Sequence, residues 1–323
     1  MTLVEDGPTT VLGTRLLRRE DPALLTGEAK FTNDLVVPGA LHMVVVRSPY
    51  AHAAIAGIDL DSALAAAGVV AAFTGADLAH LWAAPMPCAW PVTTDMKNPA
   101  HYPLATGKAC YVGDGVAVVL ATSEVAARDA AELVDVRYEP QAAVVDLEDA
   151  LSDRIVIHPD LGTNKSYQWD LKIEGTPGQV DQAFADAAYK VSERYVQQRL
   201  IPIAMEPRAV CAVPQPFGGD LTLYSTTQVP HYLHRELSRV LRLSPARIRV
   251  IQPPLGGAFG GKSEPFGHEF AAAKLAMLTG RPVKFLLSRE EEFYLHRGRH
   301  PMRIHLQGGS TRQLSHRLTA PHT

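Results

Sequence analysis

A glycine-rich segment at residues 256–263 carries the most distinctive chemistry in this sequence. It reads GGAFGGKS and lies between a predicted strand and a predicted helix. Small residues let consecutive backbone N–H groups face one bound anion or oxo group at little steric cost. The segment therefore predicts a cradle of backbone amides. The alternative is a tight turn whose glycines only permit close packing.

The same segment satisfies the phosphate-loop pattern GxxxxGK[ST], in which Lys262 would contact the terminal phosphates of ATP. Two features weigh against an ATPase. The next apolar run, residues 283–287, is followed by Ser288 and Arg289 instead of a magnesium-binding aspartate. Pro253 and Pro254 interrupt the direct passage from strand to loop that the motif requires. We therefore expect the segment to bind something other than a nucleoside triphosphate.

Gln228 is a second candidate, because it follows a predicted strand in the polar run STTQ at 225–228. A carboxamide in this position can present a neutral hydrogen-bond donor to a cleft. By itself, Gln228 would be interpreted as an ordinary surface glutamine. Together with the glycine-rich segment, it predicts a polar but uncharged binding site.

Strands and helices that could position these residues alternate without a regular βαβ period, so the predicted fold class is α+β. The long segment 83–106 holds five prolines and is predicted to be a loop. Short apolar runs predict strands at 41–47, 69–73, 116–121, 134–138, 189–197, 209–213, 221–226, 247–251 and 283–287. Helical spacing predicts helices at 61–67, 124–133, 180–188, 232–241 and 269–279.

Composition narrows the function classes. The 323 residues carry a formal net charge of −3 and are 46% hydrophobic, which disfavours nucleic acid as the main partner and excludes wholesale disorder. No apolar run approaches membrane-spanning length, and no signal peptide is recognisable, so we expect a cytoplasmic chain. The three cysteines are widely spaced, and the 13 histidines contain no HExxH pattern. We therefore predict no disulfide framework and no metal ligand from the protein.

An ordered set of motifs resembles one enzyme family across residues 13–306. The set is GEAKFTND at 27–34, RSPYAH at 47–52, YVGDGV at 111–116, MEPR at 205–208, STTQ at 225–228, GGAFGGK at 256–262 and RGRHP at 297–301. It resembles the molybdenum-hydroxylase large subunit of xanthine dehydrogenase, aldehyde oxidoreductase, aerobic carbon monoxide dehydrogenase and 4-hydroxybenzoyl-CoA reductase. The order of the motifs is more specific than any one of them.

The resemblance implies a division of the chain into an N-terminal arm, an α/β hammerhead domain, the first part of a molybdopterin-binding domain and a divergent tail. These segments are expected at residues 1–20, 21–145, 146–307 and 308–323. The tail is polar and loses the family pattern. We therefore expect either a truncated or frameshifted gene product or a chain that pairs with a second fragment.

The resemblance also implies an oxidoreductase that hydroxylates an aldehyde, a heteroaromatic ring or carbon monoxide, or carries out a related aromatic acyl-CoA reduction. Its cofactor would be molybdenum–molybdopterin cytosine dinucleotide. Iron–sulfur centres and FAD would reside on partner subunits, and large subunits could dimerise. Gln228 would donate to the apical oxo ligand of molybdenum. Cofactor contacts are likewise implied for Gly257, Ala258, Phe259 and Gly260.

Three departures from the family pattern qualify these expectations. Ala258 replaces the usual third glycine, which is strained only if its φ is positive. Ser263 stands where purine-binding relatives carry a glutamate, which disfavours xanthine as substrate. The catalytic base glutamate of the family is expected beyond residue 323, so we expect no turnover from this chain alone. The alternative is a non-catalytic binding or assembly module that keeps the fold.

Overall fold

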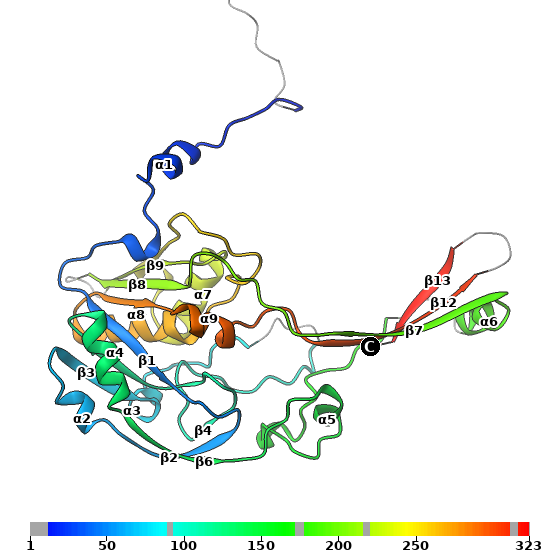
Figure 1. Cartoon of the computed structure of the whole chain (residues 1–323), viewed down its shortest axis with the longest axis horizontal. Coiled ribbons are helices and arrows are strands. Elements are labelled where there is room, and N and C mark those ends of the chain that lie inside the picture. Colours follow the sequence, from blue (N-terminus) through cyan, green and yellow to red (C-terminus); the bar gives the residue numbers. More distant parts are fainter. Residues whose placement is uncertain (1–11, 89–92, 172–177, 216–219, 311–315, 323) are drawn as a thin grey trace, which may run out of the picture.

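The computed structural model describes residues 12–88, 93–171, 178–215 and 220–310, together with the backbone of residues 316–322. A seven-stranded sheet forms the centre of the main body (Figure 1). Its strands, in spatial order, are β10 (Ile248–Ile251), β9 (Leu221–Ser225), β8 (Ala209–Pro214), β11 (Val283–Leu286), β1 (Leu41–Arg47), β5 (Gly115–Ala121) and β3 (Val69–Thr74).

This sheet crosses the boundary expected between the two domains. Strand β1 pairs in parallel with β11, with Leu41 opposite Val283, and the Leu41 amide donates to the Pro282 carbonyl at 2.7 Å. The predicted hammerhead segment therefore supplies β1, β5 and β3 to the same sheet that holds β8 to β11 of the second segment. The two segments share one core, so neither sheet half is an independent unit.

Helices cover both faces of the central sheet. Side chains alternate between the faces of a strand, and in β5 Val118 and Leu120 join the large core beneath α7 and α8, whereas Val119 packs with residues of α2 and α4. The helices of the main body are α2 (Asp61–Leu64), α3 (Gly75–Ala79), α4 (Glu124–Glu132), α7 (Pro230–Leu241), α8 (Gly267–Thr279) and α9 (Arg289–Leu295).

Local signals account for the helix ends that the sequence predicted. The Ser123 hydroxyl caps α4 by accepting from the Ala126 amide at 3.2 Å, and Gly280 ends α8 in the left-handed conformation with φ 65°. In α7, Leu233, Leu237 and Val240 are fully buried on the predicted apolar face. These elements form where the sequence pattern places them, within a few residues.

A small sheet and several short elements lie around this core. The sheet contains β4 (Lys108–Ala109), β2 (Ala53–Asp59) and β6 (Asp135–Pro140). The remaining helices are α1 (Asp21–Thr26), α5 (Leu147–Leu151) and α6 (Gln179–Ala185), with 3-10 turns at η1 (Thr32–Asp34), η2 (Pro159–Leu161) and η3 (Pro245–Arg247). Within the described residues, no helix has the length and apolar character needed to cross a membrane.

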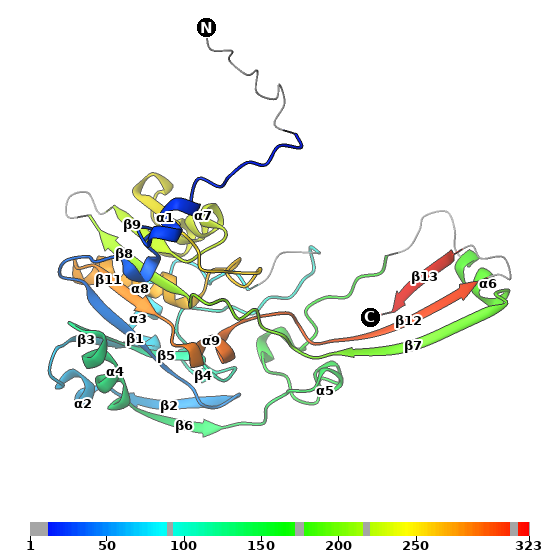
Figure 2. The ribbon, with the colours of Figure 1, turned by 45° about the horizontal axis from the view of Figure 1, so that its top comes forward.

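A third sheet projects from the main body, as Figures 1 and 2 show. It contains β13 (His316–His322), β12 (Met302–Ser310) and β7 (Tyr189–Gln197), with α6 near its far end. We call these three strands and α6 the projecting sheet. The predicted division at residue 307 falls inside β12, and the segment expected as a tail supplies the end of β12 and the backbone of β13.

Candidate functional site

The glycine-rich loop lies between β10 and α8 and adopts an unusual backbone conformation. Gly257, Phe259 and Gly260 have positive φ angles of 96°, 53° and 83°. Ala258 is not among the positive-φ residues, so its methyl group replaces a glycine without strain. Phe259 carries the strain instead, in a conformation that costs a non-glycine residue on the order of 1 kcal/mol. Its side chain is 78% exposed.

The loop contains several consecutive backbone amides that have no acceptor among the described residues. Within the described part of the chain, the amides of residues 257–260 donate to no protein atom. The flanking amides are paired: Gly256 donates to the Glu206 carboxylate and Gly261 donates to the Ala258 carbonyl. Unpaired amides gathered in one turn form a cradle for an oxygen-rich ligand. We call residues 257–260 the amide cradle.

Gln228 lies against this loop, as the sequence predicted, three residues after β9. Its backbone amide donates to the Lys262 carbonyl at 2.8 Å. Its side-chain oxygen accepts from the Lys262 amide and from the Ser263 hydroxyl, each at 3.2 Å. Because both contacts use the oxygen, the exposed carboxamide retains its NH₂ group as a donor. The loop therefore orients Gln228 as a neutral donor beside the amide cradle.

Lys262 is committed to an internal ion pair. Its side chain is 3% exposed, and its ammonium lies 2.9 Å from Oε2 of Glu206. Burial lowers the pKa of Lys262, and the ion pair with Glu206 opposes that shift. A phosphate loop needs this lysine at the terminal phosphates of its nucleotide. The geometry therefore disfavours the phosphate-loop interpretation, in agreement with the sequence pattern.

Arg208 supports the loop from inside the main body. Its side chain is fully buried and stacks on the Phe266 ring, with 3.7 Å between the guanidinium carbon and the ring centroid. It donates to the carbonyls of Gly261 and Glu264. Burial lowers the pKa of Arg208, whereas Glu269 and Glu292 raise it. Glu206 and Arg208 belong to the MEPR motif, but nothing in that motif alone assigned them a supporting role.

His296 touches the far side of the loop. A Cβ atom at Gly261 would lie 2.2 Å from His296 Nε2, so only glycine fits there. Its Nδ1 accepts from the Gly298 amide at 3.0 Å, which leaves the proton of the neutral ring on Nε2. Burial, followed by the charges of Arg208, Arg199 and Lys262, lowers the pKa of His296 to about 4. The imidazole is therefore neutral at neutral pH.

The acidic residues at the start of α9 contact neighbouring elements of the main body. Glu291 pairs with Arg47 at 2.7 Å, and the buried Glu292 accepts from the Arg208 amide. Through Glu292 and Arg208, α9 forms part of the support for the loop, whereas Glu291 connects α9 to β1. In the described residues, no three side chains of histidine, cysteine, aspartate or glutamate gather as a metal site. That the protein supplies no metal ligand stays a prediction.

Family models match both halves of the chain. The model described as "Aldehyde oxidase and xanthine dehydrogenase, a/b hammerhead domain" matches residues 26–142, and "Molybdopterin cofactor-binding domain" matches residues 157–320. The chain belongs to the molybdenum-hydroxylase large-subunit family. The predicted family and fold class are thereby confirmed.

Individual members of this family resemble most of the chain. The gamma subunit of the 6-hydroxypseudooxynicotine dehydrogenase complex of Paenarthrobacter nicotinovorans is 36% identical over 282 residues, covering 87% of this chain and 35% of that protein. The nicotinate dehydrogenase large molybdopterin subunit of Eubacterium barkeri is 30% identical over 308 residues, covering 94% and 67%. The chain thus spans about 35% of the length of the first of these relatives.

Solved structures agree with the family assignment. Quinoline 2-oxidoreductase from Pseudomonas putida 86 superposes with a TM-score of 0.85 at 31% identity, covering 93% of this chain and 37% of that one. Reconstituted CO dehydrogenase from Oligotropha carboxidovorans has a TM-score of 0.83 at 28% identity, covering 93% and 38%. In both cases the similarity extends over most of this chain and over less than half of the other one.

Proposed function

We propose that the amide cradle and Gln228 bind a molybdenum–pterin cofactor, and that the chain is the cofactor-contacting part of an oxidoreductase subunit. The observation that carries this proposal is the run of unpaired amides at residues 257–260 beside the oriented Gln228 carboxamide. The match of residues 157–320 to a molybdopterin cofactor-binding domain supports it.

The residues present fit an oxo-rich cofactor. Backbone amides and a carboxamide are neutral donors, so they can approach oxo and phosphate oxygens closely without adding a competing charge. Gln228 would hold an oxo ligand of molybdenum through its NH₂ group, and the amides of Gly257, Ala258, Phe259 and Gly260 would hold neighbouring oxygens. When bound, the molybdenum centre supplies two-electron redox chemistry that no side chain provides.

Among the described residues, the carboxylates next to the cradle take part in contacts that support the loop. The Glu206 carboxylate is tied to Lys262, and Glu292 accepts from the Arg208 amide. General-base catalysis requires a group within hydrogen-bond reach of the proton that it removes. We therefore assign this part of the chain to cofactor binding and no residue of it to proton abstraction.

For the complete reaction, we propose oxidative hydroxylation of an activated carbon, in an aldehyde, a heteroaromatic ring or carbon monoxide, or a related aromatic acyl-CoA reduction. Relatives named for nicotine hydroxylation and quinoline oxidoreduction support the heteroaromatic class. The cofactor form that we propose is the cytosine dinucleotide. As partners we propose FAD-binding and iron–sulfur subunits in the cytoplasm. Relatives named as a subunit of a complex and as a large chain support the presence of other subunits.

Cofactor retention tests the proposed binding role. The full chain is purified from a host that makes the cofactor, and molybdenum and pterin are measured per chain. Gln228→Ala should weaken retention by about 1–3 kcal/mol, because it removes a hydrogen bond to a charged ligand. Gln182→Ala, on the projecting sheet, is the matched control. Equal retention by both variants, or none by the wild type, would contradict the proposal.

Titration with ATP and magnesium separates this proposal from the nucleotide-binding alternative. We expect no ATP binding by the wild-type chain, and therefore no change in Lys262→Ala. Micromolar, magnesium-dependent binding that disappears in Lys262→Ala, with unchanged cofactor retention in Gln228→Ala, would favour a phosphate loop. Loss of retention in Gln228→Ala without any ATP binding supports the amide cradle.

A further inference from the structure

One carboxylate connects the two ends of the glycine-rich loop. Oε2 of Glu206 accepts from the Gly256 amide and from the Lys262 ammonium, each at 2.9 Å. The Glu206 amide donates back to the Gly256 carbonyl at 3.1 Å. The Glu206 side chain is 13% exposed and that of Lys262 is 3% exposed. Residues on both sides of the amide cradle are therefore bound to one buried group.

None of these contacts uses the cradle itself. Glu206 bonds to groups of residues 256 and 262, and Arg208 bonds to the carbonyls of Gly261 and Glu264. The amides of residues 257–260 stay available in the described structure. The supporting side chains thus hold the loop only at positions where a ligand would not compete with them.

The loop needs such support because its backbone is unfavourable. Three of its residues have left-handed φ angles, one of them a phenylalanine. Glycine adopts this conformation freely, but in a phenylalanine it persists only where the surroundings impose it. A loop held in its binding conformation before the ligand arrives avoids the ordering cost that a flexible loop must meet during binding.

We propose that Glu206 is a positioning residue: its carboxylate oxygen, which accepts from the Gly256 amide and pairs with Lys262, holds the amide cradle in its binding conformation before any ligand is present. The inference rests on the proposed function of the cradle and adds residues to it. It also explains why a lysine stands at this position of the phosphate-loop pattern: the Lys262 side chain pairs with Glu206 inside the protein and does not contact a nucleotide. The Glu206 carboxylate oxygen holds one end of the loop by accepting from the Gly256 amide. Its ion pair with the buried Lys262 connects it to the other end.

A matched pair of variants isolates the oxygen that Glu206 offers to Gly256. Both E206Q/K262M and E206A/K262M remove the buried charges together, so neither leaves one ion unpaired. They differ in whether a side-chain oxygen remains as acceptor. In the full chain, hydrogen exchange of the Gly256 amide should be at least about tenfold faster in E206A/K262M than in E206Q/K262M, with exchange in α8 unchanged. Equal Gly256 exchange in the two variants would overturn the proposal.

Two further comparisons keep the result interpretable. In E206Q/K262M alone, Gly256 exchange should stay within about threefold of the wild type, and faster exchange with an unchanged α8 would count against the proposal. E291Q removes another buried ion pair, that of Arg47 and Glu291, and should leave Gly256 exchange unchanged. These measurements need no cofactor, so a wild-type chain that retains no cofactor contradicts only the proposed function.

Discussion

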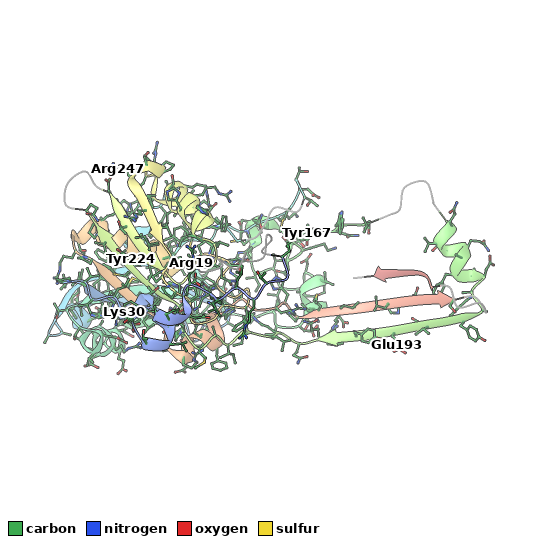
Figure 3. The ribbon with its side chains drawn as sticks, turned by 90° about the horizontal axis from the view of Figure 1, so that it is seen from above. Arg19, Lys30, Tyr167, Glu193, Tyr224 and Arg247 are labelled. Carbon is green, nitrogen blue, oxygen red and sulfur yellow. The ribbon has the colours of Figure 1, made fainter. Side chains whose placement is uncertain are left out.

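Strands β5 and β7 show how differently the two regions of the molecule are stabilised. All seven residues of β5 are buried at the centre of the main body, whereas eight of the nine residues of β7 are exposed in the projecting sheet. Tyr189, Val191 and Tyr195 lie on the same side of β7 and are each more than half exposed. Figure 3 shows Glu193 of β7 far from Tyr224 of the central sheet. Burial therefore determines the geometry of the main body but not that of the projecting sheet.

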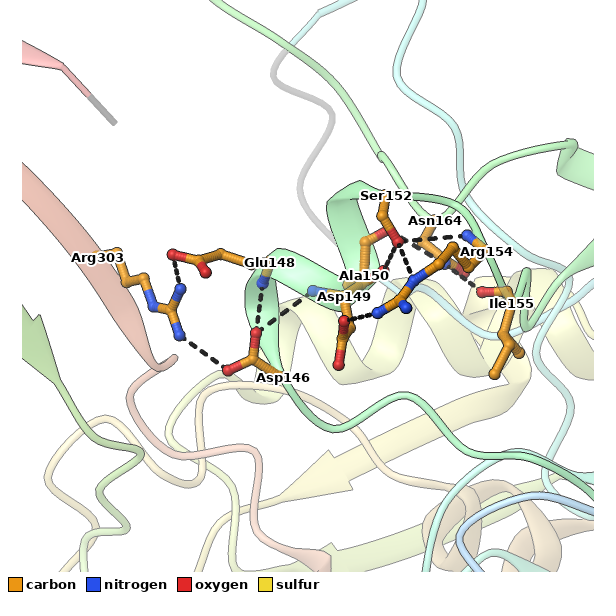
Figure 4. Close-up of polar contacts among 9 residues, drawn as sticks. All are labelled: Asp146, Glu148, Asp149, Ala150, Ser152, Arg154, Ile155, Asn164 and Arg303. Atoms are coloured by element: carbon orange, nitrogen blue, oxygen red, sulfur yellow. Dashed lines mark hydrogen bonds and ion pairs between the residues drawn. The ribbon is translucent and has the colours of Figure 1, made fainter.

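Ion pairs at the base of the projecting sheet provide some of the contacts that buried side chains provide in the main body. Arg303 of β12 contacts Asp146 at 2.8 Å and also contacts Glu148 (Figure 4). Arg194 of β7 contacts Glu148 at 2.7 Å. These side chains are 27–62% exposed, unlike the Glu206–Lys262 pair beneath the amide cradle. Exposed pairs are screened by salt and contribute little stability. The cradle is thus held by the more rigid of the two regions.

The largest effect expected from this contrast is on stability. Val118→Ala, in β5, should lower the free energy of unfolding by about 2–3 kcal/mol, because it removes buried methyl groups and leaves a cavity. Val191→Ala makes the same chemical change in β7, where the residue is 58% exposed. It should change the free energy of unfolding by less than about 0.5 kcal/mol. Urea unfolding of the full chain measures both. Equal losses would show that the projecting sheet is as tightly packed as the main body.

The second effect is a dependence of main-body stability on pH. Burial lowers the pKa of His101 and of His296 to about 4, so between pH 6.5 and 4 the unfolded chain binds protons that the folded chain does not. Acidification across this window should therefore destabilise the fold. Burial raises the pKa of Asp114 to about 6, which opposes the effect below pH 6, but one carboxyl group offsets only one of the two imidazoles.

Urea midpoints measured from pH 7 to pH 4.5 test this prediction. His101→Gln should flatten the decline, because glutamine does not titrate. His80→Gln, at an exposed position of the same region, provides the comparison and should leave the decline unchanged. A midpoint that stays constant on acidification would contradict the prediction, and a decline that is the same in all three proteins would exclude His101 as its cause.

The smallest effect concerns the ion pairs at the base of the projecting sheet. Arg303→Gln should change the free energy of unfolding by less than about 1 kcal/mol. It should, however, broaden the distribution of distances between spin labels placed at positions 193 and 132. The wild type should show the same broadening in high salt. Arg154→Gln removes an exposed pair within the α5 region that does not reach the projecting sheet, and should leave the distances unchanged. If neither high salt nor Arg303→Gln broadens the distance distribution, then packing, and not these ion pairs, determines the orientation of the projecting sheet.

The sequence predicted the elements whose patterns are local and strong. The buried runs of β1 and β5, the capped helix α4 and the glycine-terminated helix α8 were all recognisable, and Gln228 was placed near the loop that it contacts. Strand β2 was not predicted, because its alanines, glycine and aspartate form no clear alternating pattern. The strand β12 was also missed, because its residues are half-buried at most and include two glycines.

Long-range contacts explain what else the sequence could not show. The pairing of β1 with β11 joins residues about 240 positions apart, and neither strand carries a signal for its partner. Glu206 and Lys262 are likewise distant in sequence, and their pairing appears only when the chain is folded. The free amides of the cradle follow from φ angles that glycine permits but does not require.

The most direct test of the central claim is the response of the cradle amides to the cofactor itself. Backbone amide resonances of the isotope-labelled full chain are followed while the molybdenum–pterin cofactor is added, using the wild type, Gly260→Ala and Gly39→Ala. Both glycines have positive φ and open space where an alanine Cβ atom would lie, so both substitutions carry similar strain of about 1 kcal/mol. We expect the amides of residues 257–260 to shift on binding in the wild type and in Gly39→Ala, and much less in Gly260→Ala. Cradle amides that do not respond to the cofactor, or that respond equally in Gly260→Ala, would contradict the account.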